Sequence, residues 1–374
     1  MQRNKSIFFF LPFGPPSSGG CAQYYEYLRE NLSELSELRH IHVVTDIARV
    51  RECAISERCN GKFIHRVLVG FSFFKNRYVR GLAFRAQMLQ ILILIIFYSL
   101  FFGKSIYVLH SGYFSKNMFF CSGLRLLATF LNNLRIVIDF RDTSVSEVQL
   151  DAVESSVAGA IFCSINIGRM YEKWFVSREK TFSYIPVPFE SNPLHESALS
   201  NENEDLALKD YIFFPSGIDR KKGFFLVMKA IELLRARGRE LTLLVVGRNT
   251  AGGDWEKRLP PFVKYLGPVS NSDCRALMSK AECVVCLGAD EGLPRICLEA
   301  ISTGARLLAP FGVPELSNLC APAPTSDLTP DQVAALLYFE SNHVNDDEFS
   351  YDLRPHSFAN VNEEYKSFFC VLDK

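Results

Sequence analysis

Acidic residues are missing from one long part of this sequence. Over the whole chain of 374 residues, 41 Lys and Arg balance 41 Asp and Glu, yet no Asp or Glu occurs between Glu57 and Asp139. The same region contains eleven basic residues: Arg58, Lys62, Arg66, Lys75, Arg77, Arg80, Arg85, Lys104, Lys116, Arg125 and Arg135. This charge favours an anionic partner, of which a phospholipid surface and a nucleic acid are the common kinds. No pattern of a nucleic-acid-binding module is present, so we expect no nucleic acid and place a membrane surface first.

A long apolar run is missing as well. The longest, Ile91–Phe102, has twelve residues, whereas a membrane-spanning helix needs about 20. We therefore expect no span and keep two interpretations open. The run forms a helix buried in the core, or it forms a helix that inserts one side into a membrane surface while basic residues contact anionic head groups. The basic residues just before it are Lys75, Arg77, Arg80 and Arg85.

Signals of secretion and of dinucleotide binding are also lacking. No cleavable leader is recognisable before the apolar residues 7–13, so we take the 11 cysteines as reduced thiols of a cytoplasmic protein. The pattern Gly-x-Gly-x-x-Gly followed by an acid about 20 residues later does not occur. We expect no cofactor.

Alternating short apolar runs and amphipathic segments fill most of the chain, which is longer than a single core usually organises. This alternation predicts parallel sheets covered by helices. A polar, acidic stretch interrupts it, and we predict two doubly wound α/β domains, 1–190 and 211–355, joined by a linker over 191–210. Residues 356–374 are predicted to form a C-terminal helix that packs back on the first domain. Ligand sites are expected at the carboxyl ends of the strands, with a cleft between the domains.

Two glutamates, Glu291 and Glu299, flank a predicted helix start. Pro294 suits the first turn of this helix and Gly304 suits its end. Backbone N–H groups at a helix start attract phosphate, and carboxylates beside them would accept hydrogen bonds from the hydroxyls of a sugar or ribose. A capping acid and a solvated acid are the alternative interpretation of this pair.

Several segments together resemble glycosyltransferase family 4, a family of retaining enzymes with the GT-B fold. Residues 282–316 resemble its signature, with the E-x7-E pair of glutamates and a Gly-x-Pro-Glu turn. Residues 213–231, FFPSGIDRKKGFFLVMKAI, resemble its phosphate-binding segment, and residues 14–32 resemble its Gly-Gly loop. The resemblance is dense from Tyr211 to Leu316 and sparse before it. It implies two Rossmann-like domains that face each other across a cleft, the first (1–190) binding the acceptor and the second (211–355) binding the nucleotide sugar.

The resemblance implies how the donor diphosphate is held. Lys222 would neutralise its charge, with Arg220 as a helper, and Gly217 and Gly247 would let the backbone approach it. The sequence departs from the family pattern at Ile218, where the family commonly has an arginine, and the spacing from glycine to lysine is one residue shorter.

The resemblance also assigns the glutamates. Glu291 would face the transferred sugar and act in catalysis with Lys222, and Glu299 would face the ribose hydroxyls. The backbone N–H groups of Leu293 and Arg295 would lie near the phosphates. Metal-dependent sugar transfer commonly uses an Asp-x-Asp pair, and none occurs in this chain, so we expect no metal.

The amino-terminal half offers fewer candidates. Gly19 and Gly20 precede a predicted helix and are expected to line the donor site, although a plain loop after a strand explains them equally well. Asp142 follows a predicted strand, and we assign it a catalytic or acceptor-positioning role, with a structural role as the alternative. His110 ends another strand and is a weaker candidate.

These observations predict a retaining, metal-independent hexosyltransferase that moves a sugar from a nucleotide-diphosphate sugar to a glycan or lipid-linked acceptor. We expect it to act in bacterial surface-polysaccharide synthesis, in the lipopolysaccharide or capsule class, on the cytoplasmic face of the cell membrane. A nucleotide-sugar epimerase of the same fold and a catalytically silent partner subunit are the alternatives.

Overall fold

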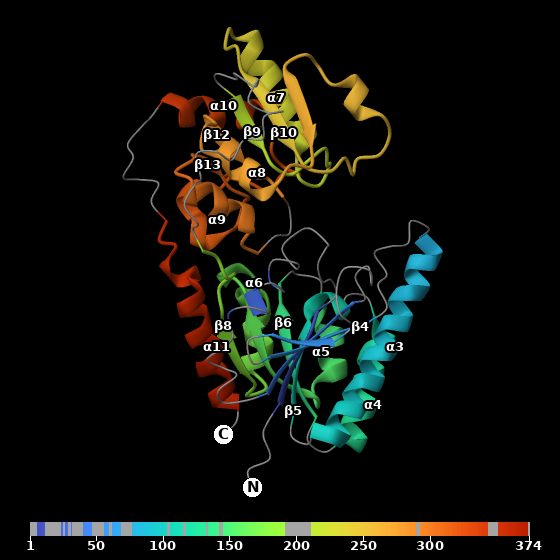
Figure 1. The fold of residues 1–374 in the computed structure, drawn as a ribbon. Coiled ribbons are helices and arrows are strands. Elements are labelled where there is room, and N and C mark those ends of the chain that lie inside the picture. The colour runs from blue at the N-terminus through green and yellow to red at the C-terminus, as the bar shows by residue number, and fades with distance from the viewer. Residues whose placement is uncertain are drawn as a thin grey trace. The chain divides into compact units, whose positions relative to one another are not determined.

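The computed structural model describes residues 6–11, 24, 27–28, 31, 40–46, 56–59, 62–68, 77–102, 105–114, 117–131, 134–141, 145–190, 211–288, 292–342 and 351–372. The chain divides into two compact units (Figure 1). Unit 1 comprises residues 1–188 and 354–374, and unit 2 comprises residues 189–353. These limits lie close to the predicted ones at 190 and 355, and the predicted linker over 191–210 lies outside the described residues.

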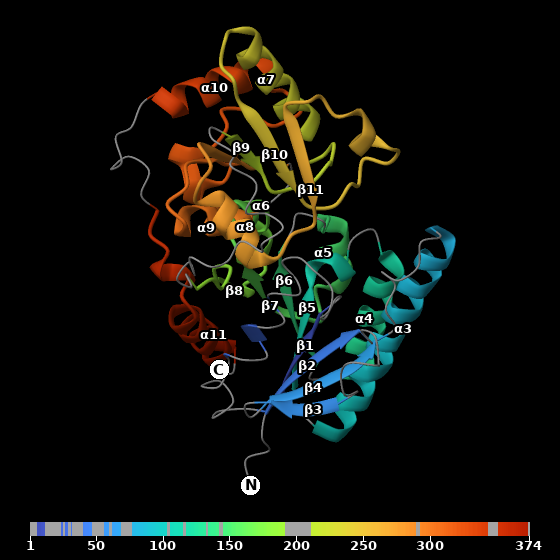
Figure 2. The ribbon, with the colours of Figure 1, turned by 45° about the horizontal axis from the view of Figure 1, so that its top comes forward.

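Unit 1 is built on an eight-stranded sheet with the order β3-β4-β2-β1-β5-β6-β7-β8 (Figure 2). Its strands are β1 Ser6–Phe10, β2 His40–Asp46, β3 Ser56–Cys59, β4 Lys62–Leu68, β5 Ser105–His110, β6 Arg135–Phe140, β7 Val157–Phe162 and β8 Thr181–Tyr184. Every pair is parallel except β3 with β4. The central strands are buried on both faces, which explains their continuous apolar sequences.

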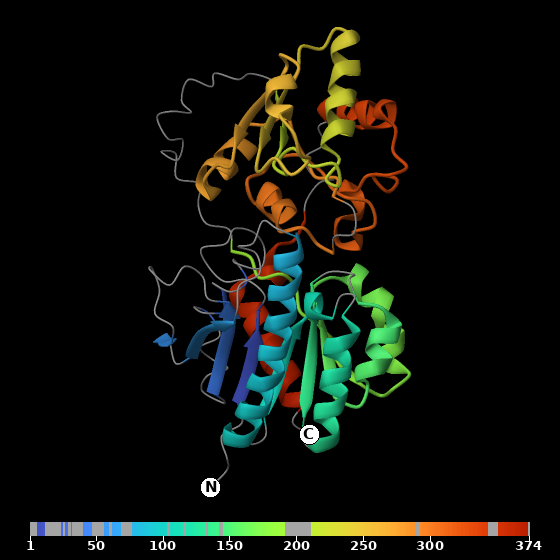
Figure 3. The same ribbon diagram turned by 90° about the vertical axis from the view of Figure 1, so that its right-hand side faces the viewer.

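Helices cover both faces of this sheet. They are α3 Arg77–Phe102, α4 Met118–Phe130, α5 Glu147–Val153, α6 Ile165–Val176 and α11 Phe358–Leu372. Alternate residues of β1 serve the two faces: Phe8 and Phe10 pack in the core that α3 to α6 cover, whereas Ile7 and Phe9 pack in the core that α11 covers. Figure 3 shows α3 and α11 on opposite sides of the sheet. The C-terminal helix therefore packs on the first unit of the chain.

Unit 2 has a five-stranded parallel sheet with the order β11-β10-β9-β12-β13. Its elements are β9 Tyr211–Phe214, α7 Phe224–Ala236, β10 Thr242–Val246, β11 Val263–Gly267, α8 Asn271–Met278, β12 Cys283–Val285, α9 Arg295–Ser302, β13 Leu307–Leu308 and α10 Pro330–Asn342. Helices α7 and α10 pack together on one face, and α8 and α9 lie on the other (Figures 1 and 3). The predicted class, two doubly wound α/β domains, is confirmed, with one antiparallel pair added in unit 1.

The apolar run Ile91–Phe102 belongs to a helix much longer than the run itself. Helix α3 has 26 residues, and its part Gly81–Phe102 is long and apolar enough to cross a membrane by length and composition. The expectation that this segment is too short to span was therefore wrong. That expectation considered only the uninterrupted apolar run. The helix begins earlier and includes Arg85, Gln87 and Gln90, but most of the residues around them are apolar, so the mean hydropathy stays high.

Candidate functional site

In unit 2 the segments that follow β9 and β12 meet. These strands are neighbours, and the chain leaves β9 toward β10 but leaves β12 toward β13, so a topological switch point lies between them. The two segments are in contact, because a Cβ added at Gly223, after β9, would lie 3.2 Å from the Cβ of Leu287, after β12. The structure thus brings together the segments that contain most of the predicted donor-binding residues.

Gly217 and Gly247 allow the ends of β9 and β10 to approach closely. Both have positive φ, +71° and +120°, and the Gly217 N–H donates to the Val246 carbonyl over 2.8 Å. A Cβ at Gly217 would lie 2.1 Å from the Arg248 carbonyl oxygen, and one at Gly247 would lie 2.8 Å from the Gly217 nitrogen. Only glycine fits these positions, which accounts for both residues structurally. Their predicted contact with a donor stays a prediction.

Asp219 organises the turn between β9 and α7. Its Oδ1 accepts hydrogen bonds from the backbone N–H groups of Lys221 at 2.7 Å and Lys222 at 3.2 Å, and the Thr250 hydroxyl donates to Oδ2. Burial acts to raise the pKa of this carboxyl, but these hydrogen bonds outweigh it and hold the pKa below its usual value. The turn ends at Gly223, which is the N-cap of α7 and has a φ of +84°, a value that favours glycine. The backbone that presents Lys222 is therefore fixed by local contacts.

Lys222 is half-buried beside the β12 segment. Burial lowers the pKa of its ammonium, and the nearby Asp219 carboxylate opposes this effect. Its charge thus lies where less water solvates it, and an anion placed there would regain part of that solvation. Lys221, the preceding residue, is exposed and provides a natural comparison.

Helix α9 begins at Arg295, directly after Pro294, and Leu293 is buried just before it. The Arg295 Nε lies 3.2 Å from Glu299 Oε1, and the guanidinium lies over the Phe189 ring, 5.2 Å from its centroid. Glu299 is buried, with 3% exposure. Burial lowers the pKa of Arg295 despite the opposing effect of Glu299.

The predicted roles on this helix stay predictions. Oε1 of Glu299 already accepts from Arg295, so a ribose hydroxyl would share this carboxylate with the arginine. Glu291, the predicted partner of the transferred sugar, lies outside the described residues.

The structure shows what Ile218, where the sequence departs from the family pattern, and the nearby Arg220 contact. Ile218 is fully buried in the core of unit 2 and forms a β-bridge with Asn249, so this position holds a core side chain. Arg220 is exposed, and its guanidinium lies over the Phe225 ring, 4.8 Å from the centroid. A helper role toward a diphosphate would require Arg220 to leave this ring.

The sequence contains one Cys-x-x-Cys spacing, Cys283 to Cys286, which is a common spacing for metal ligands. Side chains alternate along a strand, and Cys283 packs in the core that α7 covers while Cys286 faces Cys297 of α9. Burial raises the pKa of Cys297, and its hydrogen bond with Cys286 raises it further, so Cys297 is a neutral thiol. Among the residues that the structure describes, no group of His, Cys, Asp or Glu could hold a metal ion.

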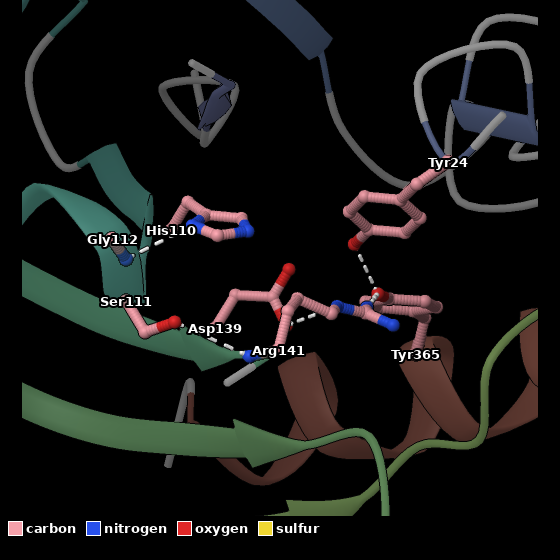
Figure 4. Close-up of polar contacts among 7 residues, drawn as sticks. All are labelled: Tyr24, His110, Ser111, Gly112, Asp139, Arg141 and Tyr365. Carbon is pink, nitrogen blue, oxygen red and sulfur yellow. Dashed lines mark hydrogen bonds and ion pairs between the residues drawn. The ribbon is translucent and has the colours of Figure 1, made fainter. Parts of the chain in front are cut away.

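In unit 1 a polar network lies at the carboxyl end of β6 (Figure 4). The Arg141 Nε donates to Asp139 Oδ1 over 2.8 Å, and an Nη of Arg141 donates to the Tyr365 hydroxyl of α11 over 2.9 Å. The guanidinium also lies 4.0 Å from the ring centroid of Tyr24, whose hydroxyl bonds to that of Tyr365. Burial acts to lower the pKa of Arg141, but Asp139 and the tyrosines hold it above its usual value. Arg141 is therefore a permanent, half-buried cation that ties the end of β6 to α11.

His110 and Ser111 flank this network at the end of the adjacent strand β5 (Figure 4). The His110 Nδ1 accepts from the Gly112 N–H over 3.0 Å, and the Ser111 hydroxyl accepts from the Arg141 N–H over 3.3 Å. Asp142, like Gly19 and Gly20, lies outside the described residues, so its predicted role stays a prediction. The partner of Arg141 that the structure shows is Asp139, two residues earlier.

Sequence reasoning missed Asp139, Tyr24 and Tyr365. The signal for Asp139 was present, because an acid and a base two residues apart at a strand end project to the same face. No local pattern indicates Tyr365, which reaches Arg141 across 224 positions of the chain.

Comparisons with known proteins show a family match in unit 2 and similar folds over the whole chain. Residues 199–309 match the family described as Glycosyl transferases group 1. A search of curated proteins finds no match. Among solved structures, sucrose-phosphate synthase from Thermosynechococcus elongatus is similar with a TM-score of 0.66 at 14% identity, over 98% of this chain and 95% of the other. The α,α-trehalose 6-phosphate synthase from Burkholderia multivorans gives 0.68 at 12%, over 100% and 99%. Anabaena Alr3699/HepE, in complex with UDP-glucose, gives 0.63 at 13%, over 98% and 99%.

The structural likenesses extend over whole chains, and the chain has the fold of these proteins, GT-B. The family match covers the segments after β9 and β12 and confirms the expected enzyme class, a glycosyltransferase. It does not extend to unit 1, where the acceptor was expected.

Proposed function

We propose that this chain transfers a sugar from a nucleotide-diphosphate sugar to an acceptor hydroxyl, with retention of configuration and without a metal ion. The observation that carries the proposal is the half-buried Lys222, presented by the rigid turn after β9 beside the segment that leads into α9. This arrangement lies within residues 199–309, the part that matches the glycosyltransferase family. UDP-glucose, bound in the Anabaena protein, supports a nucleotide sugar as donor.

The first step is to hold the diphosphate. Lys222 contributes a cation, and the positive end of the helix dipole at the start of α9 contributes a charge of the same sign. As the bond between sugar and phosphate breaks, negative charge grows on the leaving diphosphate. Groups fixed in advance around that charge stabilise the transition state more than the ground state, because they need not reorganise.

The second step is attack by the acceptor hydroxyl. With retention, we expect attack from the side that the diphosphate leaves, so that the departing phosphate oxygen takes the hydroxyl proton. No separate base is then required. Glu291 would hold the transferred sugar, and Asp142 would position the acceptor.

Metal independence rests on the residues that would hold the diphosphate. Lys222 provides a fixed positive charge, and no Asp-x-Asp pair occurs in the sequence. A divalent ion would compete with Lys222 for the same phosphate oxygens.

The acceptor we favour is a lipid-linked glycan precursor of a surface polysaccharide, at the cytoplasmic face of the membrane. The basic residues of 58–138 support it, since a lipid phosphate is anionic. A phosphorylated sugar is the second candidate, because two of the similar structures are synthases of sucrose phosphate and trehalose 6-phosphate.

The test is product analysis with UDP-, GDP- and ADP-sugars in EDTA, offering a lipid-linked or a phosphorylated acceptor in parallel. We expect a free nucleoside diphosphate together with a glycosylated acceptor, and the acceptor that is glycosylated decides between the two candidates. An epimerised nucleotide sugar would identify an epimerase instead, and absence of turnover with tight nucleotide binding would identify a silent subunit. Activity that disappears in EDTA and returns with Mn²⁺ would refute the metal-independent mechanism.

A further inference from the structure

Helix α3 is apolar on both of its long sides, although only one side packs on the sheet. Its inner side contributes Met88, Ile91, Ile95 and Tyr98 to the core of unit 1. Its outer side carries a stripe of large apolar residues at helical spacing, mostly three or four apart, with exposed Arg85 in the one gap of seven between Leu82 and Leu89. The exposed members of this stripe are Tyr78, Leu82, Leu89, Ile93, Ile96, Phe97, Leu100 and Phe101.

Helix α4 lies against α3 and extends the stripe into a broader surface (Figure 3). It adds four exposed apolar residues: Met118, Phe119, Leu126 and Phe130. Between the amino-terminal parts of the two helices lies a groove of about 830 Å³, lined by Leu82, Phe84, Leu89, Met118 and Phe119 with Arg85. We call these exposed residues of α3 and α4 the outer apolar face. An exposed face with this many large apolar side chains on two neighbouring helices is typical of an interaction surface.

The outer apolar face does not indicate a membrane span. The inner side of α3 packs on the strands of unit 1 and contacts β4 and β5. If α3 crossed a bilayer, these strands would have to enter the bilayer with it. Only a third of its most apolar window is buried, so α3 is not an enclosed core helix either. A helix with one side in the core and an apolar side outside suits a surface that it enters partway.

Charge decides which partner covers this face. In α3 and α4 every charged residue of the sequence is basic, and the two whose exposure the structure describes, Arg85 and Arg125, are both exposed. A second copy of the chain would place these like charges against each other, which opposes self-association. Anionic head groups complement them while the acyl region receives the apolar side chains. We propose that the outer apolar face docks unit 1 on an anionic lipid bilayer surface without crossing it.

This inference stands apart from the proposed function, because docking needs neither donor nor acceptor. If it holds, unit 1 would be held at the surface where a lipid-linked acceptor is presented. Vesicle binding without transfer would count only against the proposed function, and transfer to soluble acceptors without vesicle binding would count only against docking.

The first experiment is flotation of the full chain with vesicles of phosphatidylcholine alone or with one quarter phosphatidylglycerol. We expect about tenfold stronger partition into the anionic vesicles at low salt, reduced at 1 M salt because the screening length falls from about 10 Å at 0.1 M to about 3 Å. The apolar contribution is tested by the triple substitution Leu82→Gln, Ile93→Gln and Leu100→Gln, which should weaken binding by about tenfold or more.

A matched control changes equally exposed apolar residues elsewhere on unit 1: Met170→Gln and Val176→Gln of α6 and Val371→Gln of α11. It should bind like the unchanged chain. For the charge contribution, Arg85→Gln with Arg125→Gln should weaken binding to anionic vesicles only, whereas Arg258→Gln with Lys280→Gln in unit 2 should not. All of these side chains are exposed, so folding is expected to survive and is checked by circular dichroism.

A second measurement asks how the face meets the membrane. Ile93→Trp should show a blue-shifted emission that brominated lipids quench, whereas Met170→Trp should not. The proposal is overturned if the unchanged chain ignores anionic vesicles at low salt, or if the apolar triple variant binds them equally well. A dimer in sedimentation equilibrium that the triple variant dissociates, without vesicle binding, would assign the face to a second copy and overturn it too.

Discussion

The two units present their candidate residues in different ways. In unit 2 the turn after β9 holds Lys222 through hydrogen bonds to a residue three positions away, Asp219. In unit 1 the half-buried Arg141, just after β6, is held by Asp139 of that strand and by Tyr365, which lies 224 positions further along the chain. A local turn can be recognised as a motif, while a network closed by tertiary structure cannot. The family match, which covers unit 2 and not unit 1, follows the same division.

The largest effect on stability is expected in the network of unit 1. Arg141→Met would leave the Asp139 carboxylate buried without its cation, and we expect a loss of about 3–5 kcal/mol in the free energy of unfolding. Adding Asp139→Asn should restore much of it, since the uncompensated charge is removed. Lys366→Ala on α11 breaks an exposed pair with Glu363 and should cost less than about 1 kcal/mol. Urea unfolding of all four proteins gives the comparison; equal losses for Arg141→Met and Lys366→Ala would show that the network is not structural.

A backbone clash should destabilise unit 2 by a comparable or smaller amount. Gly217→Ala places a Cβ against the Arg248 carbonyl at a positive φ, and we expect a loss on the order of 3 kcal/mol. Gly238 also has a positive φ, +91°, but a Cβ there meets nothing within 4 Å. Gly238→Ala should therefore cost only the conformational strain, about 1 kcal/mol. Thermal unfolding of the two variants distinguishes the cost of the clash with Arg248 from the cost of a positive φ alone. Similar melting temperatures would contradict the account of Gly217.

The glutamates should affect different kinetic constants. Glu291→Gln is expected mainly to lower kcat, because Glu291 would face the transferred sugar, and Glu299→Gln to raise the KM of the donor, because Glu299 would face the ribose. Each should lose about 1–3 kcal/mol of transition-state or donor stabilisation. Steady-state kinetics with the donor varied distinguishes the two, and two folded variants with unchanged constants would remove both assignments.

The smallest effect concerns pH. Burial lowers the pKa of Lys222, so the folded chain binds fewer protons there than the unfolded chain between this lowered pKa and the ordinary lysine value. In that window stability contributed by this site rises with pH, while affinity for an anionic donor falls because the ammonium is lost. In Lys222→Arg the guanidinium stays charged, and the fall in affinity should move to higher pH. Identical pH profiles for the two proteins would show that Lys222 does not set the donor's pH dependence.

Sequence patterns predicted the fold better than the site. The alternation of apolar strands and helices suffices for two doubly wound sheets because strands buried on both faces read as continuous apolar runs, as in SIFFF of β1. The place of Lys222 beside the β12 segment was predictable because the switch point follows from strand order. The partner of Arg141 was not, and neither was the dual character of α3, whose inner and outer sides carry equally apolar residues. Periodicity marks a buried side only when the opposite side is polar.

The central claim is that unit 2 binds a nucleotide diphosphate through Lys222, and calorimetric titration with UDP, GDP and ADP in EDTA tests it most directly. We expect one nucleotide to bind the unchanged chain and Lys221→Ala equally well, and to bind Lys222→Ala at least about tenfold more weakly, because in the proposed site the half-buried cation would face the diphosphate and its exposed neighbour would not. Equal affinity in Lys222→Ala and Lys221→Ala, with both variants folded, would contradict the claim.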